Sequence, residues 1–377
     1  MATSYSPGKN GSFVGIDAKY WTLIALVIQN AATVLLLHHS CTMPTVRGQR
    51  FYASTAILLA EIIKLAFAAT MALYEIATSL QRSETPTIGE LARAISRAVF
   101  TGDSWKLAIP ASLYVVQNSL QYVAASNLDL VVFAVTCQLK LVSTAVFNGI
   151  LNGRVHSLKQ WLSLAAVGAG VGVVDLSALA RAGKSGSGKS VHVARSAYFP
   201  EDTWGLRDIV RAAADHLSKR SATYEGIHSD FEAAYPQPDI VTGLAAALAA
   251  CLLSGVASVY FEKLLKVKGE HSKSIWIRNV QLTFYAIWPA LFLGVLFLDG
   301  EHIAKTGFFA GYDSTVLILI LFQAVGGILV ASSLAQASAG LKCLAMLPST
   351  LIVVLAGVFF LDLSVTLLVL SAPREEH

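Results

Sequence analysis

The first long apolar stretch of the chain, residues 20–38, reads YWTLIALVIQNAATVLLLH and contains no Asp, Glu, Lys or Arg. About 20 such residues let a helix cross the hydrocarbon core of a bilayer. Of all 377 residues, 55% are hydrophobic and only 14% are charged, where a soluble domain carries roughly 25% charged residues. With a mean hydropathy of +0.59, this composition argues against a water-soluble globule and against an enzyme of the aqueous phase. It predicts an all-α polytopic membrane protein.

Similar apolar windows recur along the whole chain. We predict membrane spans at Tyr20–His38, Tyr52–Ser79, Leu107–Ala125, Leu128–Ile150, Leu158–Leu179, Ile240–Glu262, Trp276–Leu298, Thr315–Leu334 and Leu341–Leu361. A last apolar piece, Leu363–Leu370, is too short to cross a bilayer as a helix, so we interpret it as the stub of a truncated tenth helix. Five spans before a polar stretch and four plus a stub after it predict an inverted five-plus-five helix repeat, an arrangement of many transporters.

The distribution of basic residues predicts the orientation. Most Lys and Arg of the short loops lie on the side of the N-terminus, and such loops stay cytosolic. We therefore predict a cytosolic tail at 1–19, membrane halves at 20–179 and 240–371 joined by a polar, partly disordered lumenal loop at 180–239, and a tail at 372–377. The first residues lack the pattern of a removable signal peptide. The net charge of +4 comes without a dense basic tract, so lipid rather than nucleic acid is the expected surrounding.

One motif in the loop matches an enzyme signature. Residues 183–190 read GKSGSGKS, which fits the phosphate-binding pattern G-x-x-x-x-G-K-[ST] and would make Lys189 a phosphate ligand of an ATPase. That pattern needs a buried strand before it and a helix after it, whereas a membrane span precedes it here. We interpret the match as the composition of a Gly/Ser/Lys linker. The four cysteines are far apart and His38-His39 lacks partners at ligand spacing, so no metal, cofactor or catalytic residue is predicted.

Charged side chains inside the predicted spans are informative, because an ionised group at mid-bilayer costs at least ~2.5–3.5 kcal/mol and faces a polar cavity or a partner. Glu61 and Lys64 are three residues apart and can neutralise each other, so an ion pair and a ligand contact both remain open. Lys140 and Lys342 have no acidic neighbour within one turn and lie in opposite halves. They predict a site for a doubly negative ligand at the repeat interface. Alternatively, one or both extend to a membrane surface.

Polar and small residues accompany these lysines. A polar face of the third span follows i, i+3, i+4, i+7 spacing and consists of Tyr114, Gln117, Asn118 and Gln121. It can line a water-accessible groove or form an interhelical hydrogen-bond seam. Tyr260, followed by Glu262-Lys263, adds an aromatic ring at the end of the sixth span. Gly326-Gly327 permits close helix packing or the approach of a ligand to the backbone.

Several longer motifs resemble the Golgi nucleotide-sugar transporter family, which carries UDP-galactose, UDP-N-acetylglucosamine and CMP-sialic acid. They are VIQN at 27–30, FYASTAILLAEIIK at 51–64, YVVQNSLQYVAASNLD at 114–129, QLKL at 138–141, SVYFEK at 258–263 and QAVGG at 323–327. The resemblance implies a ten-helix drug/metabolite-transporter fold with both termini cytosolic. It also implies exchange of a cytosolic nucleotide sugar for a lumenal nucleoside monophosphate across the Golgi membrane, or that of the endoplasmic reticulum.

The resemblance also implies the site. Nucleotide-contacting positions fall on Tyr114, Gln117, Asn118, Lys140, Tyr260 and Lys342, with both lysines facing phosphate and with Gly326 and Gly327 lining the cavity. A UDP-sugar carries about two negative charges and UMP nearly two at pH 7, so two lysines suit both exchange partners. We expect an antiporter of UDP-galactose and UMP.

Other functions stay open. Alternative substrates are UDP-N-acetylglucosamine and CMP-sialic acid. The chain could instead be a non-transporting scaffold that associates with a glycosyltransferase. The scaffold is favoured by the short tenth helix and by AQASA at 335–339, where the family has a charged KYADN. Cys137 stands where the family often has Tyr, which removes one possible ligand contact. Association of the chain with further copies of itself, as a homo-oligomer, also stays open.

Overall fold

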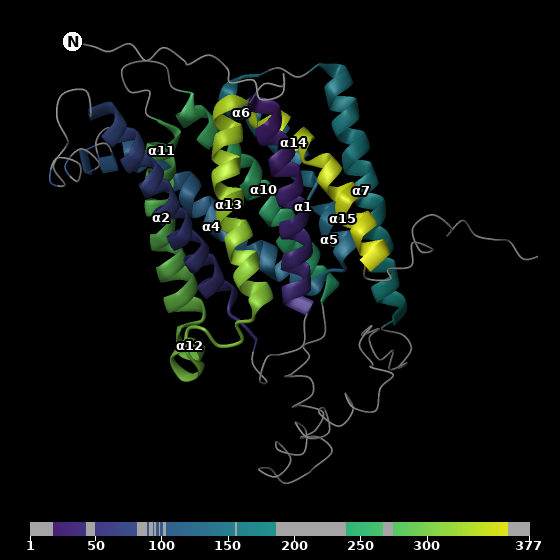
Figure 1. The fold of residues 1–377 in the computed structure, drawn as a ribbon. Coiled ribbons are helices and arrows are strands. Elements are labelled where there is room, and N and C mark those ends of the chain that lie inside the picture. The colour runs from purple at the N-terminus through teal and green to yellow at the C-terminus, as the bar shows by residue number, and fades with distance from the viewer. Residues whose placement is uncertain are drawn as a thin grey trace, which may run out of the picture.

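The computed structural model describes residues 18–42, 50–80, 103–154, 157–185, 239–266 and 274–360, together with positions 89, 93, 96–97 and 99–100. All regular structure among them is helical, and the long helices run side by side between two ends of a bundle (Figure 1). This confirms the prediction of an all-α polytopic fold. We call the end at which the first helix begins the Ala18 end and the opposite one the Thr42 end.

The helices before the long polar loop are α1 (Ala18–Thr42), α2 (Ala53–Leu80), the short η1 (Asp103–Leu107), α4 (Ala108–Asn127), α5 (Leu130–Thr136), α6 (Leu139–Asn152) and α7 (Leu158–Ser185). Those after it are α10 (Ile240–Leu265), α11 (Ile275–Pro289), η2 (Ala290–Leu298), α12 (Gly300–Thr306), α13 (Ser314–Gln336), α14 (Ala339–Ala345) and α15 (Leu347–Phe360). The two halves interlock: α4 and α6 pack along α10, while α1 and α2 pack along α13.

Eight helical stretches within the described residues are long and apolar enough to cross a membrane. They correspond to all predicted spans except Leu107–Ala125. That segment does form a helix, α4, but it is not among the eight. Its polar residues, including Gln117, Asn118 and Gln121, lower its hydropathy, and it packs against helices of the other half. A helix surrounded by protein can carry more polar groups than one that faces lipid.

Two of the predicted spans are interrupted by tightened turns. The fourth predicted span divides into α5 and α6, where Leu141 N donates to the Gln138 carbonyl three residues earlier (2.9 Å). The ninth divides into α14 and α15, where Ser349 N donates to the Met346 carbonyl (3.1 Å). Such 3₁₀-type turns inside a helix often mark functional hinges. A third span changes its winding after Pro289, where α11 passes into the wider turns of η2.

Some predictions fall outside the described residues. They include most of the 180–239 loop, the stub Leu363–Leu370, and the terminal tails. The domain boundaries and the orientation of the chain stay predictions. Residues 183–185 of the phosphate-loop match continue helix α7, so a helix occupies the place of the strand that an ATPase loop requires.

Candidate functional site

A chain of hydrogen bonds fixes Lys342 inside the bundle. Lys342 is only 4% exposed, and its Nζ donates to Ser258 Oγ on α10 (2.9 Å). Ser258 Oγ also shares a hydrogen bond with the hydroxyl of Tyr114 on α4 (3.2 Å). One residue from the first half and two from the second are therefore linked through the Ser258 hydroxyl. The alternative that Lys342 extends to a membrane surface does not fit this burial.

Lys140 lies close to this chain. It occupies the first turn of α6, the helix against which the Lys342 helix α14 packs, and it is half-buried. Within the described part of the chain its ammonium group has no hydrogen-bond or ion-pair partner, whereas its carbonyl accepts from Ser143 (3.0 Å) and Thr144 (2.6 Å). Two like charges held near each other in a medium of low dielectric repel strongly. An anion between them would relieve that repulsion.

The helix interruptions lie beside these two lysines. The turn at Gln138 immediately precedes Lys140, and the turn at Met346 follows Lys342 by one helical turn. Irregular backbone at membrane depth is tolerated where it is buried in protein or lines a cavity. Interrupted helices of this kind form the midplane sites of many transporters. The lysine helices therefore combine a cationic group with a local change of helix winding.

Helices α4 and α11 pack against each other, and both carry buried polar groups without partners among the described residues. Gln117 is 8% exposed, while Asn279 and Thr283 on α11 are fully buried. Gln117 Oε1, both amide atoms of Asn279 and Thr283 Oγ1 have no hydrogen-bond partner among the described residues. Buried polar groups are normally satisfied by protein, water or a ligand. Asn279 and Thr283 were missed in the sequence analysis, although their i, i+4 spacing in an apolar span is a readable signal.

A second polar group surrounds the two predicted glycines. Lys64 Nζ donates to Glu61 Oε1 (2.7 Å), and Glu61 is 3% exposed. A Cβ at Gly327 would lie 2.8 Å from Lys64 Cδ, and one at Gly326 would overlap the Gln29 side chain. The glycines thus let α13 approach polar side chains of α1 and α2 closely. Glu61 is paired with Lys64 through one carboxylate oxygen, and its other oxygen has no partner among the described atoms. Both predicted roles, an ion pair and a ligand contact, therefore fit this geometry.

Two predicted residues occupy less central places. Asn118 is half-buried on the same helix as Gln117. Tyr260 packs its ring against the apolar core, and within the described residues its hydroxyl makes no hydrogen bond. The structure therefore joins Tyr114 and Lys342 through Ser258 and packs the Lys140 helix against that of Lys342. Among the described residues, no polar contact draws Tyr260 into this group.

Glu262 links several helices at the Ala18 end of the bundle. It is 1% exposed and accepts from Lys266 Nζ (2.8 Å) and from the backbone N–H of Ala339 (2.7 Å). Arg154, which follows α6, lies 3.5 Å away. One buried carboxylate thus ties together a helix end of the first half and two elements of the second.

We expect Glu262→Gln to destabilise the protein by about 1.5–3 kcal/mol, because it removes charge-assisted hydrogen bonds that the buried carboxylate accepts. The measurement is the apparent melting temperature in detergent, which should fall by several degrees. Glu301→Gln is the control: Glu301 pairs with Lys305 at 2.6 Å but is 78% exposed, and exposed pairs contribute about 0–1 kcal/mol. Equal shifts for both variants would contradict the role of Glu262.

Fold and site together define a polytopic membrane protein with a buried cationic interior shared by two halves of the chain. The chain belongs to the nucleotide-sugar transporter family, whose model matches residues 14–372. It is 36% identical to a UDP-galactose transporter of Schizosaccharomyces pombe, over 96% of this chain and 86% of that protein. It is 33% identical to a UDP-N-acetylglucosamine transporter of Rattus norvegicus, over 92% and 88% of the two chains. It is also 33% identical to a UDP-galactose translocator of Canis lupus familiaris, over 88% and 67%.

These findings confirm the family that the sequence motifs indicated. The relatives are transporters rather than enzymes, in agreement with the predicted absence of catalytic chemistry. The protein is a multi-pass membrane transporter of nucleotide sugars.

Proposed function

We propose that the chain exchanges a cytosolic UDP-sugar for lumenal UMP across the Golgi membrane. The observation that carries the proposal is the buried Lys342, which is hydrogen-bonded to Ser258 and lies on a helix that packs against the Lys140 helix of the other half. A pair of cations suits both partners of the exchange, since a UDP-sugar carries about two negative charges and UMP nearly two at pH 7.

Each group has a task in this mechanism. Lys342 and Lys140 would hold the phosphates, and Tyr114, which already shares Ser258 with Lys342, would contribute a hydroxyl beside them. The unpaired Gln117 Oε1 and the unpaired amide of Asn279 would supply the acceptors and the donor that a pyrimidine base requires. A buried site left with one unpaired polar atom discriminates against ligands that cannot satisfy it.

Reorientation would use the interrupted helices. With the Ala18 end facing the cytosol, the turns at Gln138 and Met346 let the lysine-bearing segments change their angle without unwinding a whole helix. Two unneutralised lysines disfavour the reorientation of an empty carrier. Because the empty carrier reorients less readily than the loaded one, import of the UDP-sugar is coupled to export of UMP.

UDP-galactose is the substrate that we favour. Support comes from the Schizosaccharomyces pombe relative, which is named for it. UDP-N-acetylglucosamine is the alternative, because several similar proteins are named for that substrate.

The test is uptake of labelled nucleotide sugars by vesicles that contain the purified chain. We expect UDP-galactose uptake into UMP-loaded vesicles to exceed uptake into unloaded vesicles at least tenfold, with weaker uptake of UDP-N-acetylglucosamine and CMP-sialic acid. Equal uptake with and without internal UMP would contradict the exchange. A scaffold would show neither uptake nor thermal stabilisation by UMP.

A further inference from the structure

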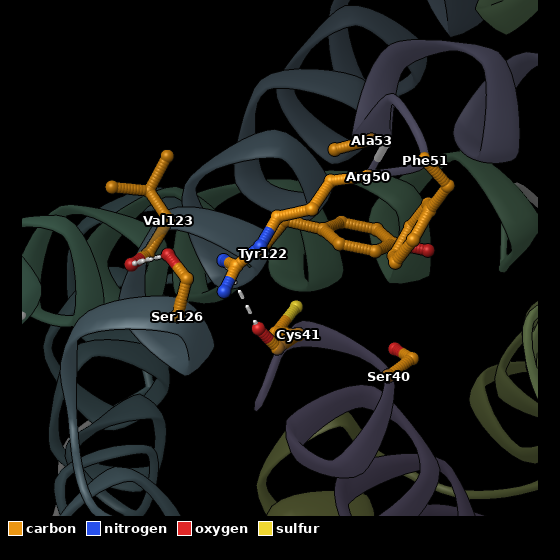
Figure 2. Close-up of a pocket in the computed structure, with 8 residues that line it drawn as sticks. All are labelled: Ser40, Cys41, Arg50, Phe51, Ala53, Tyr122, Val123 and Ser126. Atoms are coloured by element: carbon orange, nitrogen blue, oxygen red, sulfur yellow. Dashed lines mark hydrogen bonds between the residues drawn. The ribbon is translucent and has the colours of Figure 1, made fainter. Parts of the chain in front are cut away.

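A separate cavity lies at the Thr42 end of the bundle. It has a volume of about 190 Å³, and Figure 2 shows its walls, which come from the end of α1, the segment before α2 and the last turns of α4. Its lining includes Ser40, Cys41, Arg50, Phe51, Tyr122 and Ser126. Pockets that enclose whole small-molecule ligands measure about 300–1,000 Å³. This cavity is therefore of a size to receive one part of a nucleotide.

Arg50 supplies the charge of this cavity. Its side chain is exposed and reaches across the cavity toward α1 (Figure 2), where Nη1 donates to the Cys41 carbonyl at 3.4 Å. Among the described residues no carboxylate pairs with it. Lys305, on the nearby α12, is instead neutralised by Glu301 at 2.6 Å. A guanidinium with most of its five donors uncommitted is well suited to bidentate binding of a phosphate.

Aromatic side chains connect the cavity with the interior. The rings of Phe51 and Tyr122 meet edge to face with centroids 6.1 Å apart. Tyr122 is 3% exposed, and its hydroxyl donates to Gln323 Oε1 on α13 (3.2 Å). Gln323 lies one turn before Gly326 and Gly327. The Tyr122–Gln323 bond therefore links the cavity wall to α13, one turn before the glycines that pack against Gln29 and Lys64.

We propose that this cavity is a reception site for a nucleoside monophosphate that enters from the Thr42 end. Arg50 binds its phosphate, and the rings of Phe51 and Tyr122 lie beside the nucleoside. The ligand then passes to the lysines when the Tyr122–Gln323 bond opens. This inference rests on the proposed function, in which the Thr42 end faces the lumen and UMP is collected there.

The first test measures each face of the membrane separately, in sealed Golgi vesicles loaded with graded UMP. Arg50→Gln is expected to raise the internal UMP concentration that gives half-maximal exchange about tenfold. The external UDP-galactose concentration for half-maximal uptake should stay unchanged. Arg50→Lys should fall between these values, and Lys305→Gln, the control at the same end, should match the parent protein. An unchanged UMP requirement, or equal effects on both faces, overturns the proposal.

The second test does not depend on transport. Ser126 is exposed in the cavity wall, so Ser126→Cys should react with a maleimide, and UMP should slow that reaction severalfold. Protection should vanish with Arg50→Gln and persist with Lys140→Ala. Equal protection by inorganic phosphate or by uridine alone overturns the assignment to a nucleoside monophosphate, as does unchanged labelling with UMP. Protection without any exchange by the parent chain would reject the proposed function and retain the site.

Discussion

Lys140→Ala and Lys342→Ala are each expected to reduce exchange of UDP-galactose for UMP by at least a hundredfold. Each variant removes one of two cations that would contact the phosphates, and charge-assisted hydrogen bonds to a desolvated anion contribute about 1.5–3 kcal/mol or more. Lys342→Ala also leaves Ser258 without its ammonium donor. The measurement is the initial rate of labelled UDP-galactose uptake into UMP-loaded proteoliposomes.

Lys159→Ala is the matched control, because Lys159 lies exposed near the start of α7 and contributes nothing to the buried charge. It should transport at the parental rate. Melting temperatures of all three variants separate a lost contact from lost folding. Undiminished exchange by a well-folded Lys140→Ala would reject the role of the lysine pair.

Gly327→Val is expected to abolish transport and to lower the apparent melting temperature. A side chain at this position would meet Lys64 and force it away from Glu61, its partner at 2.7 Å. Separating a buried carboxylate from the cation paired with it costs about 3–5 kcal/mol. Exchange rate and melting temperature, measured on the same preparation, test this expectation.

Gly168→Val on α7 serves as the control, because among the described residues no atom from another element lies within 4 Å of a Cβ placed there. It should retain both transport and stability. If Gly327→Val behaved like Gly168→Val, the close approach of α13 to the Glu61–Lys64 pair would have no importance for the protein.

The candidate site shows how far side-chain chemistry can be predicted from sequence. Lys140 and Lys342 were recognisable because a charge in an apolar span needs a partner or a cavity. The distance between the two lysines could not be predicted, since it depends on how α6, α10 and α14 pack. Asn279 and Thr283 were overlooked because uncharged polar residues are common in membrane helices and usually form ordinary interhelical hydrogen bonds.

Membrane class, helix positions and family were all contained in the order of residues along the chain. Each span must satisfy its own backbone and bury enough apolar surface to lie in lipid, so these properties are local and leave a direct pattern. This local pattern does not determine which polar groups contact one another. Three features depend on contacts between residues far apart in sequence: the hydrogen bond of Lys342 to Ser258, the hydrogen bond of Ala339 to Glu262, and the cavity at Arg50. Hydropathy determines only which segments enter the membrane, whereas packing determines which of their faces touch.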